Sequence, residues 1–185
     1  MNINAEIKKQ ILLERERLTF SPLSTQKATG IGVARFVISC NSNALDILQL
    51  AKKVLLIVNN QSIGLWPSFE HWKKILPVEF VDNCLPELTE QERLESQVKW
   101  DRLTYEEKLE NAAQDECWTL SSWLAWLEPT EREWFWWNAI VLEPPLDNTH
   151  FLVEVTPLDS PFMSGALKWL FKACGAKDVV SEDEL

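Results

Sequence analysis

The sequence predicts an α+β fold, in which a small antiparallel sheet built around a C-terminal β-hairpin packs with several helices. Apolar residues recur at helical spacing over most of the chain, whereas residues 133–142 and 150–156 are rich in aromatic and β-branched residues or alternate with polar ones. The expected order is αβα, then helices, then ββα. It lacks the strict strand–helix alternation that builds a parallel sheet.

Length and composition indicate one domain over residues 1–185, because no break in composition marks a boundary. With 46% hydrophobic residues, the chain can bury a sizeable core. Charge divides it into two parts. Residues 1–74 carry ten Lys or Arg and five Asp or Glu, and residues 75–185 carry eight and twenty-three. The second, tryptophan-rich part is therefore strongly acidic.

The first third of the chain predicts two helices and a strand. Helical spacing of isoleucines and leucines predicts a helix over residues 3–17, and the run Val33–Cys40 predicts a strand that could join the hairpin. Asn43 can cap a helix that begins near Ala44. Within it, residues 54–58 form an apolar run that could instead be a buried strand, and periodicity does not decide between the two.

Capping signals and prolines divide the middle of the chain into helices. Thr89 with Glu92 and Thr104 with Glu107 both have the spacing of a capping box. The helices expected here span residues 68–76, 90–103, 105–116 and 119–127.

The C-terminal part predicts a hairpin followed by a helix. The connection 143–149 contains two prolines, which prevent strand pairing from continuing through it. Ser160-Pro161 predicts the start of the last helix and Gly175 its end. The acidic tail from Asp178 is expected to fray.

The run Trp134-Phe135-Trp136-Trp137 is the most unusual segment. Side chains alternate along a strand, so Trp134 and Trp136 are expected on one face and Phe135 and Trp137 on the other. Either helices or a partner cover both faces, or one aromatic face is exposed as a binding platform. The sequence leaves both alternatives open.

From this run we expect a non-enzymatic binding or accessory protein that acts through an aromatic and acidic surface on a protein partner or on a second copy. The candidate binding residues are Trp134, Trp136, Glu131, Glu133 and His150. A sugar stacked on the indoles is an alternative ligand, with Glu143 and Asp147 near enough to accept hydrogen bonds from its hydroxyls.

The runner-up is a hydrolytic enzyme of unrecognised type that uses Cys40 or an acidic pair near the 133–156 hairpin. Cys40 ends a strand just before a helix N-terminus, a place that lowers a thiol pKa. Common catalytic loops are not indicated. Gly30-Ile31-Gly32 precedes a strand rather than following one, and five glycines in all leave little room for a phosphate-binding loop.

The cysteines and histidines indicate neither a metal site nor a cofactor. No two of the four cysteines have metal-ligand spacing, so we expect reduced, mostly buried thiols; they are Cys40, Cys84, Cys117 and Cys174. No signal for export or membrane insertion is evident, which predicts a cytoplasmic protein. Nucleic acid is not an expected partner, because the N-terminal basic residues alternate with Glu6, Glu14 and Glu16 as on a solvated helix face.

One resemblance concerns the C-terminal third. The segments that carry it are Trp134-Phe135-Trp136-Trp137, Phe151-Leu152-Val153-Glu154-Val155, Pro161-Phe162 and Gly165 to Phe171. This region resembles uncharacterised conserved proteins from cyanobacteria. The resemblance implies a cytoplasmic setting and assigns no activity, ligand or catalytic residue.

Overall fold

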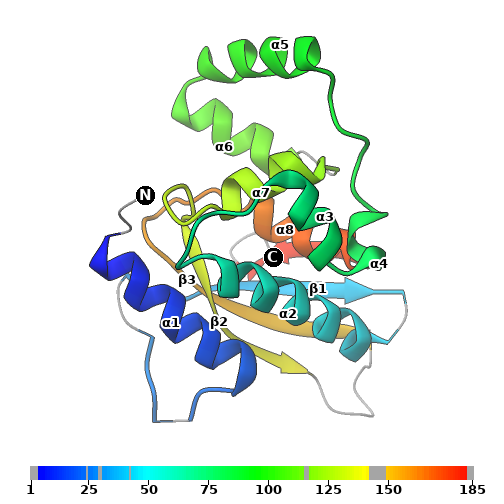
Figure 1. Ribbon diagram of the computed structural model, residues 1–185. Coiled ribbons are helices and arrows are strands. Elements are labelled where there is room, and N and C mark those ends of the chain that lie inside the picture. The colour runs from blue at the N-terminus through cyan, green and yellow to red at the C-terminus, as the bar shows by residue number, and fades with distance from the viewer. Residues whose placement is uncertain are drawn as a thin grey trace.

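A computed structural model describes residues 4–23, 25–28, 31–41, 43–114, 117–141 and 149–182. The fold is α+β, as the sequence predicts, with a four-stranded antiparallel sheet (Figure 1). The elements are α1 (Ala5–Thr19), β1 (Ala34–Cys40), α2 (Ala44–Gln61), α3 (Phe69–Ile75), α4 (Val78–Val81), α5 (Glu90–Asp101), α6 (Tyr105–Gln114), α7 (Leu120–Leu127), β2 (Trp134–Val141), β3 (His150–Pro157), α8 (Gly165–Ala173) and β4 (Ala176–Ser181). Gly30, Glu143 and Asp147 lie outside the described residues.

The strands lie in the order β2-β3-β1-β4, and each neighbouring pair is antiparallel. The expected hairpin of β2 and β3 is confirmed, and β1 joins it by pairing with β3. The prediction of a frayed tail from Asp178 is wrong, because residues 176–181 form the edge strand β4. The physical reason is Val179, which pairs with Ile38 and is buried among the core residues.

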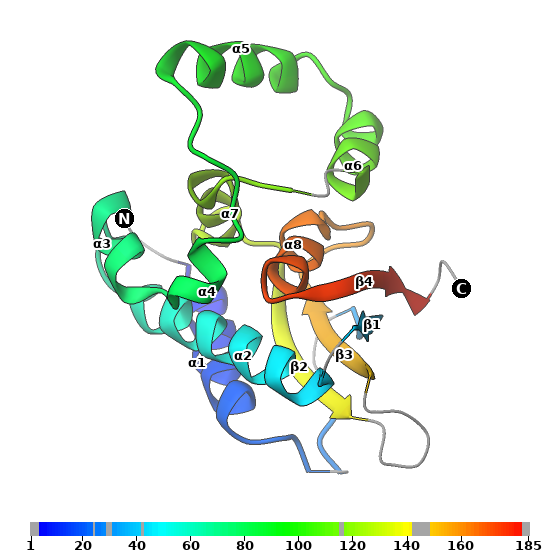
Figure 2. The same cartoon turned by 90° about the vertical axis from the view of Figure 1, so that its right-hand side faces the viewer.

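Helices α2 and α8 cover one face of the sheet (Figure 2). The hydrophobic core lies between these helices and the sheet. Residues 54–58 are helical, and Ala51, Val54, Leu55 and Val58 are fully buried at helical spacing. The strand alternative for this run is therefore wrong. The core face of the sheet is lined by alternate residues of its strands, among them Phe36, Ile38, Cys40, Phe151, Val153 and Val155.

Most helix ends follow the capping signals. Asn43 accepts a hydrogen bond from the N–H of Leu45 at the start of α2, and both predicted capping boxes form. Gly175, with a φ of 99°, ends α8 as expected. The start of α8 was predicted wrongly: it begins at Gly165 rather than beside Ser160-Pro161.

The preceding loop explains this later start. Both of its ends are tied to Glu133, whose carbonyl accepts from the N–H of Leu158 (2.8 Å) and whose carboxylate accepts from the N–H of Met163 (2.7 Å). Residues 158–163 are therefore held beside Glu133 at the end of the sheet, and α8 begins only after them.

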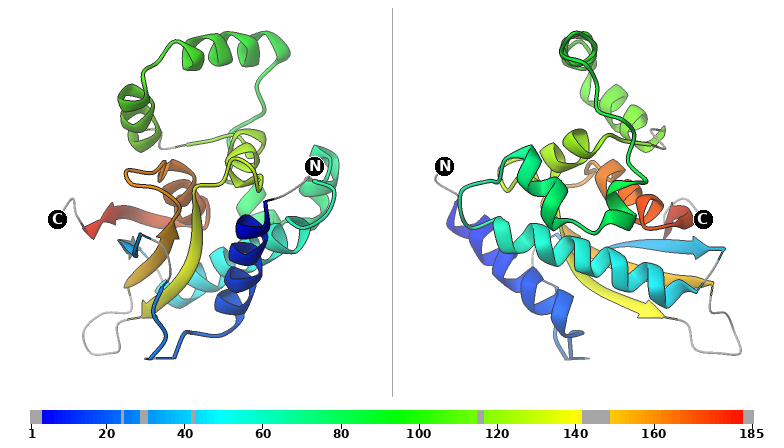
Figure 3. Two further views of the ribbon diagram at one scale, coloured as in Figure 1. Left: turned by 90° about the vertical axis from the view of Figure 1, so that its left-hand side faces the viewer. Right: turned by 45° about the vertical axis from the view of Figure 1, so that its right-hand side comes forward.

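Helices α5 and α6 form an arm that stands away from the sheet (Figure 3). At its far side, the Tyr105 hydroxyl donates to the carbonyl of Pro161 (3.0 Å), which ties the start of α6 to the loop before α8. None of the twelve residues of α5, all of them described, is buried. The segment between α4 and α7 thus leaves the body of the protein and places the solvent-exposed helix α5 opposite α7.

Candidate functional site

The tryptophan run of β2 lies in the core. Trp134 and Trp136 are each 1% exposed, and the ring centroid of Trp136 is 6.3 Å from that of Phe171 on α8. One set of side chains therefore packs under the C-terminal helix, as the alternation predicts. Neither indole can form a surface platform in this conformation.

Two arginines cover the other side chains of the run. The guanidinium carbon of Arg132 lies 4.8 Å from the ring centroid of Phe135, and that of Arg17 lies 4.8 Å from the ring centroid of Trp137. Arg132 is also 4.8 Å from the ring of Trp134. Cation–π contacts of this kind allow a charged group to shield an aromatic surface from water. Both faces of the run are therefore covered, and neither is an exposed aromatic platform.

The remaining candidate residues do not gather into one site. Glu133 is engaged by the N–H of Met163, as described above. His150 lies at the start of β3, where its Nδ1 is 2.9 Å from the Thr149 hydroxyl. Glu131 is exposed and lines a cleft between α5 and α7. Of the five residues, only Glu131 borders this cleft.

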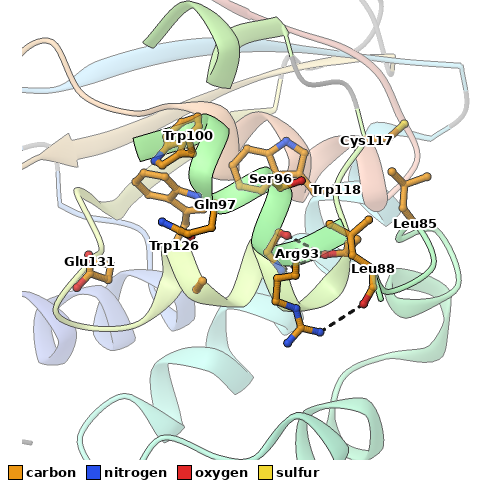
Figure 4. A pocket seen from close by; sticks show the side chains of 13 residues that line it. Leu85, Leu88, Arg93, Ser96, Gln97, Trp100, Cys117, Trp118, Trp126 and Glu131 are labelled. Carbon is orange, nitrogen blue, oxygen red and sulfur yellow. Dashed lines mark hydrogen bonds between the residues drawn. The ribbon is translucent and has the colours of Figure 1, made fainter. Parts of the chain in front are cut away.

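The cleft has a volume of about 540 Å³ and separates the α5 arm from the body of the protein (Figure 4). Three tryptophans line it: Trp100 from α5, Trp118 just before α7, and Trp126 from α7. The rings of Trp100 and Trp126 meet edge to face, with centroids 5.9 Å apart. The lining combines these indoles with polar side chains, among them Gln97, Thr119 and Glu131.

Local sequence explains why these tryptophans face one another. On α7, Trp123, Leu124 and Leu127 are buried, which leaves Trp126 half-buried on the adjacent side of the helix. Trp100 lies in the last turn of α5, where the Lys108 ammonium of α6 is 5.6 Å from its ring centroid. The contact with Trp126 therefore holds the C-terminal end of α5 against α7.

The other end of the cleft is fixed by the segment that leads into α5. The N–H of Leu85 donates to the carbonyl of Trp118 (2.9 Å), and the carboxylate of Glu87 accepts from the N–H (3.0 Å) and the hydroxyl of Ser121. These contacts anchor one hinge of the arm at the N-terminus of α7. The cleft is thus held at both ends, while the length of α5 stays in solvent.

Polar groups on α5 face this cleft and have few partners in the protein. Ser96 and Gln97 line it, and the Gln97 amide donates to Asp101 on the same helix at 2.8 Å. Among the described residues, the Arg93 side chain makes one long contact, of 3.5 Å, with the carbonyl of Leu88. Figure 4 shows these side chains along one wall, with Trp126 and Glu131 on the other. A ligand could therefore combine apolar stacking with hydrogen bonds.

The hydrolytic alternative finds little support at Cys40. The thiol faces the core, whereas His150 pairs with Ser39 in the sheet and lies on the opposite face. Burial raises the pKa of the Cys40 thiol, which disfavours the nucleophilic thiolate. Cys40 is therefore a buried core residue without a histidine beside it on its own face of β1.

The other cysteines divide by exposure. All four are free thiols, but only Cys40 and Cys174 are buried; Cys84 is half-buried and Cys117 is exposed at the cleft. The expectation of mostly buried thiols therefore holds for two of four. Burial raises the pKa of Cys84 to about 11.

The described residues contain no group of three or more His, Cys, Asp or Glu side chains suited to a metal ion. Among the same residues, no helix is long and apolar enough to cross a membrane. No family model, no curated protein and no solved structure matches the chain.

Proposed function

We propose that this chain is a non-enzymatic binding or accessory protein whose cleft between α5 and α7 receives a basic amphipathic segment of a protein partner. The observation that carries the proposal is the state of α5. None of its residues is buried, yet it is held over a tryptophan-lined cleft. A helix in this position is stabilised when a ligand fills the space beneath it.

The energetics of α5 favour an occupied cleft. Isolated helices shorter than about 12–15 residues are marginal in water, and most helical stability in proteins comes from packing. The twelve residues of α5 make one ring contact to α7, through Trp100. Leu94 and Val98 are 62% and 50% exposed and do not line the cleft. A segment bound in the cleft would add packing on the side of α5 that carries Arg93, Gln97 and Trp100.

Charge indicates the chemistry of the occupant. Residues 86–114, which contain the arm, carry eight Asp or Glu and four Lys or Arg. Glu131 adds an acidic group on the opposite wall. An acidic surface attracts a basic partner and repels an acidic one, which affects association rate and specificity more than affinity. An amphipathic helix with an apolar face and basic flanks fits both the tryptophans and this charge.

A synthetic peptide tests the proposal. The probe is a fluorescently labelled 18-residue helix with leucines on one face and lysines on the other, compared with a peptide in which glutamates replace the lysines. Fluorescence anisotropy should show saturable binding of the lysine peptide only. Trp126→Ala and Trp100→Ala should each weaken that binding at least tenfold, because aromatic anchors dominate such interfaces.

The matched control is Trp66→Ala, which removes a half-buried tryptophan that contacts Trp72 outside the cleft. It should leave peptide affinity unchanged. The proposal fails if the lysine peptide does not bind, or if all three variants bind it equally well.

A further inference from the structure

The sheet face turned away from α2 and α8 carries a row of apolar side chains across all four strands. Cross-strand pairing sets Ile140 of β2 opposite Leu152 of β3, Leu152 opposite Val37 of β1, and Val37 opposite Val180 of β4. Paired residues point to the same face, so these four side chains form one continuous line. Because Phe36 and Ile38 point into the core, the line lies on the opposite, outer face.

Within the described part of the chain, the side chains of this row stay accessible to solvent. Ile140 is 44% exposed, and the other three side chains are half-buried. In Figure 2 no helix of the described residues lies on this side of the sheet. Arg17 and Arg132 cover only the first residues of β2, Phe135 and Trp137. An apolar line across an open sheet is typical of an interaction surface.

Beside the apolar row lies a charged one. Arg35 of β1 pairs with Glu154 of β3 in the sheet, and its Nε donates to the Glu154 carboxylate at 3.0 Å. The Arg35 side chain is half-exposed and also lies 3.6 Å from Glu182 beyond β4. The guanidinium therefore has room to contact a further carboxylate from outside the chain.

We propose that two copies of this chain associate through their outer sheet faces. The two-fold axis lies in the plane between the two sheets, runs parallel to the strands, and passes midway between β3 and β1 in projection. This axis sets β3 over the partner's β1 and β2 over the partner's β4. Leu152 then meets the partner's Val37, and Ile140 meets the partner's Val180. Each Arg35 lies over the partner's Glu154, so apolar residues and opposite charges both match.

The size of the face sets the strength of the dimer. Four strands spaced about 4.8 Å apart span roughly 20 Å, so each copy contributes well under the ~800 Å² that a stable interface buries per partner. The dimer is therefore weak and forms only at high protein concentration. Packing of twisted sheets at about −30° keeps the central strands in the closest contact.

Sedimentation velocity from ~10 µM to ~1 mM tests the dimer. The wild-type chain should shift from monomer towards dimer as concentration rises. Val37→Glu and Leu152→Lys should each weaken self-association at least tenfold, because each sets an unpaired charge against an apolar residue of the other copy. An equimolar mixture of the two variants should recover association, since the axis sets the introduced carboxylate of one copy over the introduced ammonium of the other.

Leu65→Glu is the matched control, because Leu65 is an exposed apolar residue in the loop before α3 and lies outside this face. It should associate as the wild type does. If Val37→Glu or Leu152→Lys does not fold by circular dichroism, Ile140→Glu and Val180→Lys form the second pair. A wild-type chain that stays monomeric throughout, or folded variants whose mixture does not associate, would overturn the proposal.

Discussion

Arg132 and Glu14 form a fully buried ion pair that joins the start of β2 to α1. Both terminal nitrogens of Arg132 donate to the Glu14 carboxylate, which also accepts from Asn59 Nδ2 and from the N–H of Trp136, each at 2.8 Å. The N–H of Trp136 belongs to an edge strand, so Glu14 closes an edge that would otherwise be unpaired. Four donors on one carboxylate offset the cost of burying its charge.

Breaking this pair should strongly destabilise the protein. Glu14→Gln leaves the Arg132 charge buried without a counter-ion and should lower the free energy of unfolding by about 3–5 kcal/mol. Urea denaturation measures the loss. Glu6→Gln on the same helix, where the exposed side chain accepts a hydrogen bond from Gln10, should change stability by no more than about 1 kcal/mol. Equal effects of the two substitutions would contradict the role of Glu14.

Trp136→Ala should act on stability and not on binding. The indole is buried against Phe171, so its removal leaves a cavity and should cost about 3–5 kcal/mol of unfolding free energy. Chemical denaturation measures this cost, and peptide anisotropy under native conditions measures the affinity of the folded fraction. A stable variant that has lost binding would show that the β2 tryptophans are a surface after all.

The capping box of α5 should make its helicity depend on pH. Hydrogen bonds from the hydroxyl and the N–H of Thr89 lower the pKa of Glu92 from its usual 4.5. A lowered carboxyl pKa stabilises the helix above about pH 4.5, and this contribution is lost as the pH falls through the lowered pKa.

Circular dichroism of Glu92→Gln against wild type measures this contribution. The variant should be less helical at about pH 7, and the difference should shrink as the pH falls through the lowered pKa of Glu92. Glu95→Gln, one turn further along α5, removes the same charge without the cap and is the control. A difference between Glu92→Gln and wild type that does not change with pH would contradict the cap.

The four thiols should react in three steps. Cys117 is exposed and should react with a chromogenic disulfide reagent in the native protein, whereas Cys84 should react slowly because its pKa is raised to about 11. Cys40 and Cys174 should react only after denaturation. Cys117→Ser should abolish the fast phase. Simultaneous reaction of all four thiols in native buffer would contradict the burial.

Features encoded by neighbouring residues could be predicted from the sequence. The capping boxes, the Asn43 cap and the alternation in β3 depend on residues within a few positions, and each appears in the structure. The final strand was missed because Asp178 and Glu182 mark the tail as polar, while Val179 gains its burial from Ile38 far along the chain.

The candidate site could not be predicted because it, too, depends on contacts between residues that are far apart in the sequence. Trp100, Trp118 and Trp126 are three scattered tryptophans among ten, and only the path of the α5–α6 arm brings them around one cleft. The run at 134–137 fits a covered strand and an exposed platform equally well, and only the packing of distant residues such as Arg17 over Trp137 decides between the two. The alternating charges predict a solvated face for Glu14, and this is wrong because its partner Arg132 lies 118 positions away in the sequence.

Hydrogen–deuterium exchange of α5, with and without the lysine peptide, tests the central claim most directly. In the free chain the amides of residues 90–101 should exchange fast, since no residue of this helix is buried. Saturating peptide should slow their exchange, and Trp126→Ala should remove that protection. A peptide that binds while the exchange of α5 and α7 stays unchanged would contradict the assignment of the cleft as the binding site.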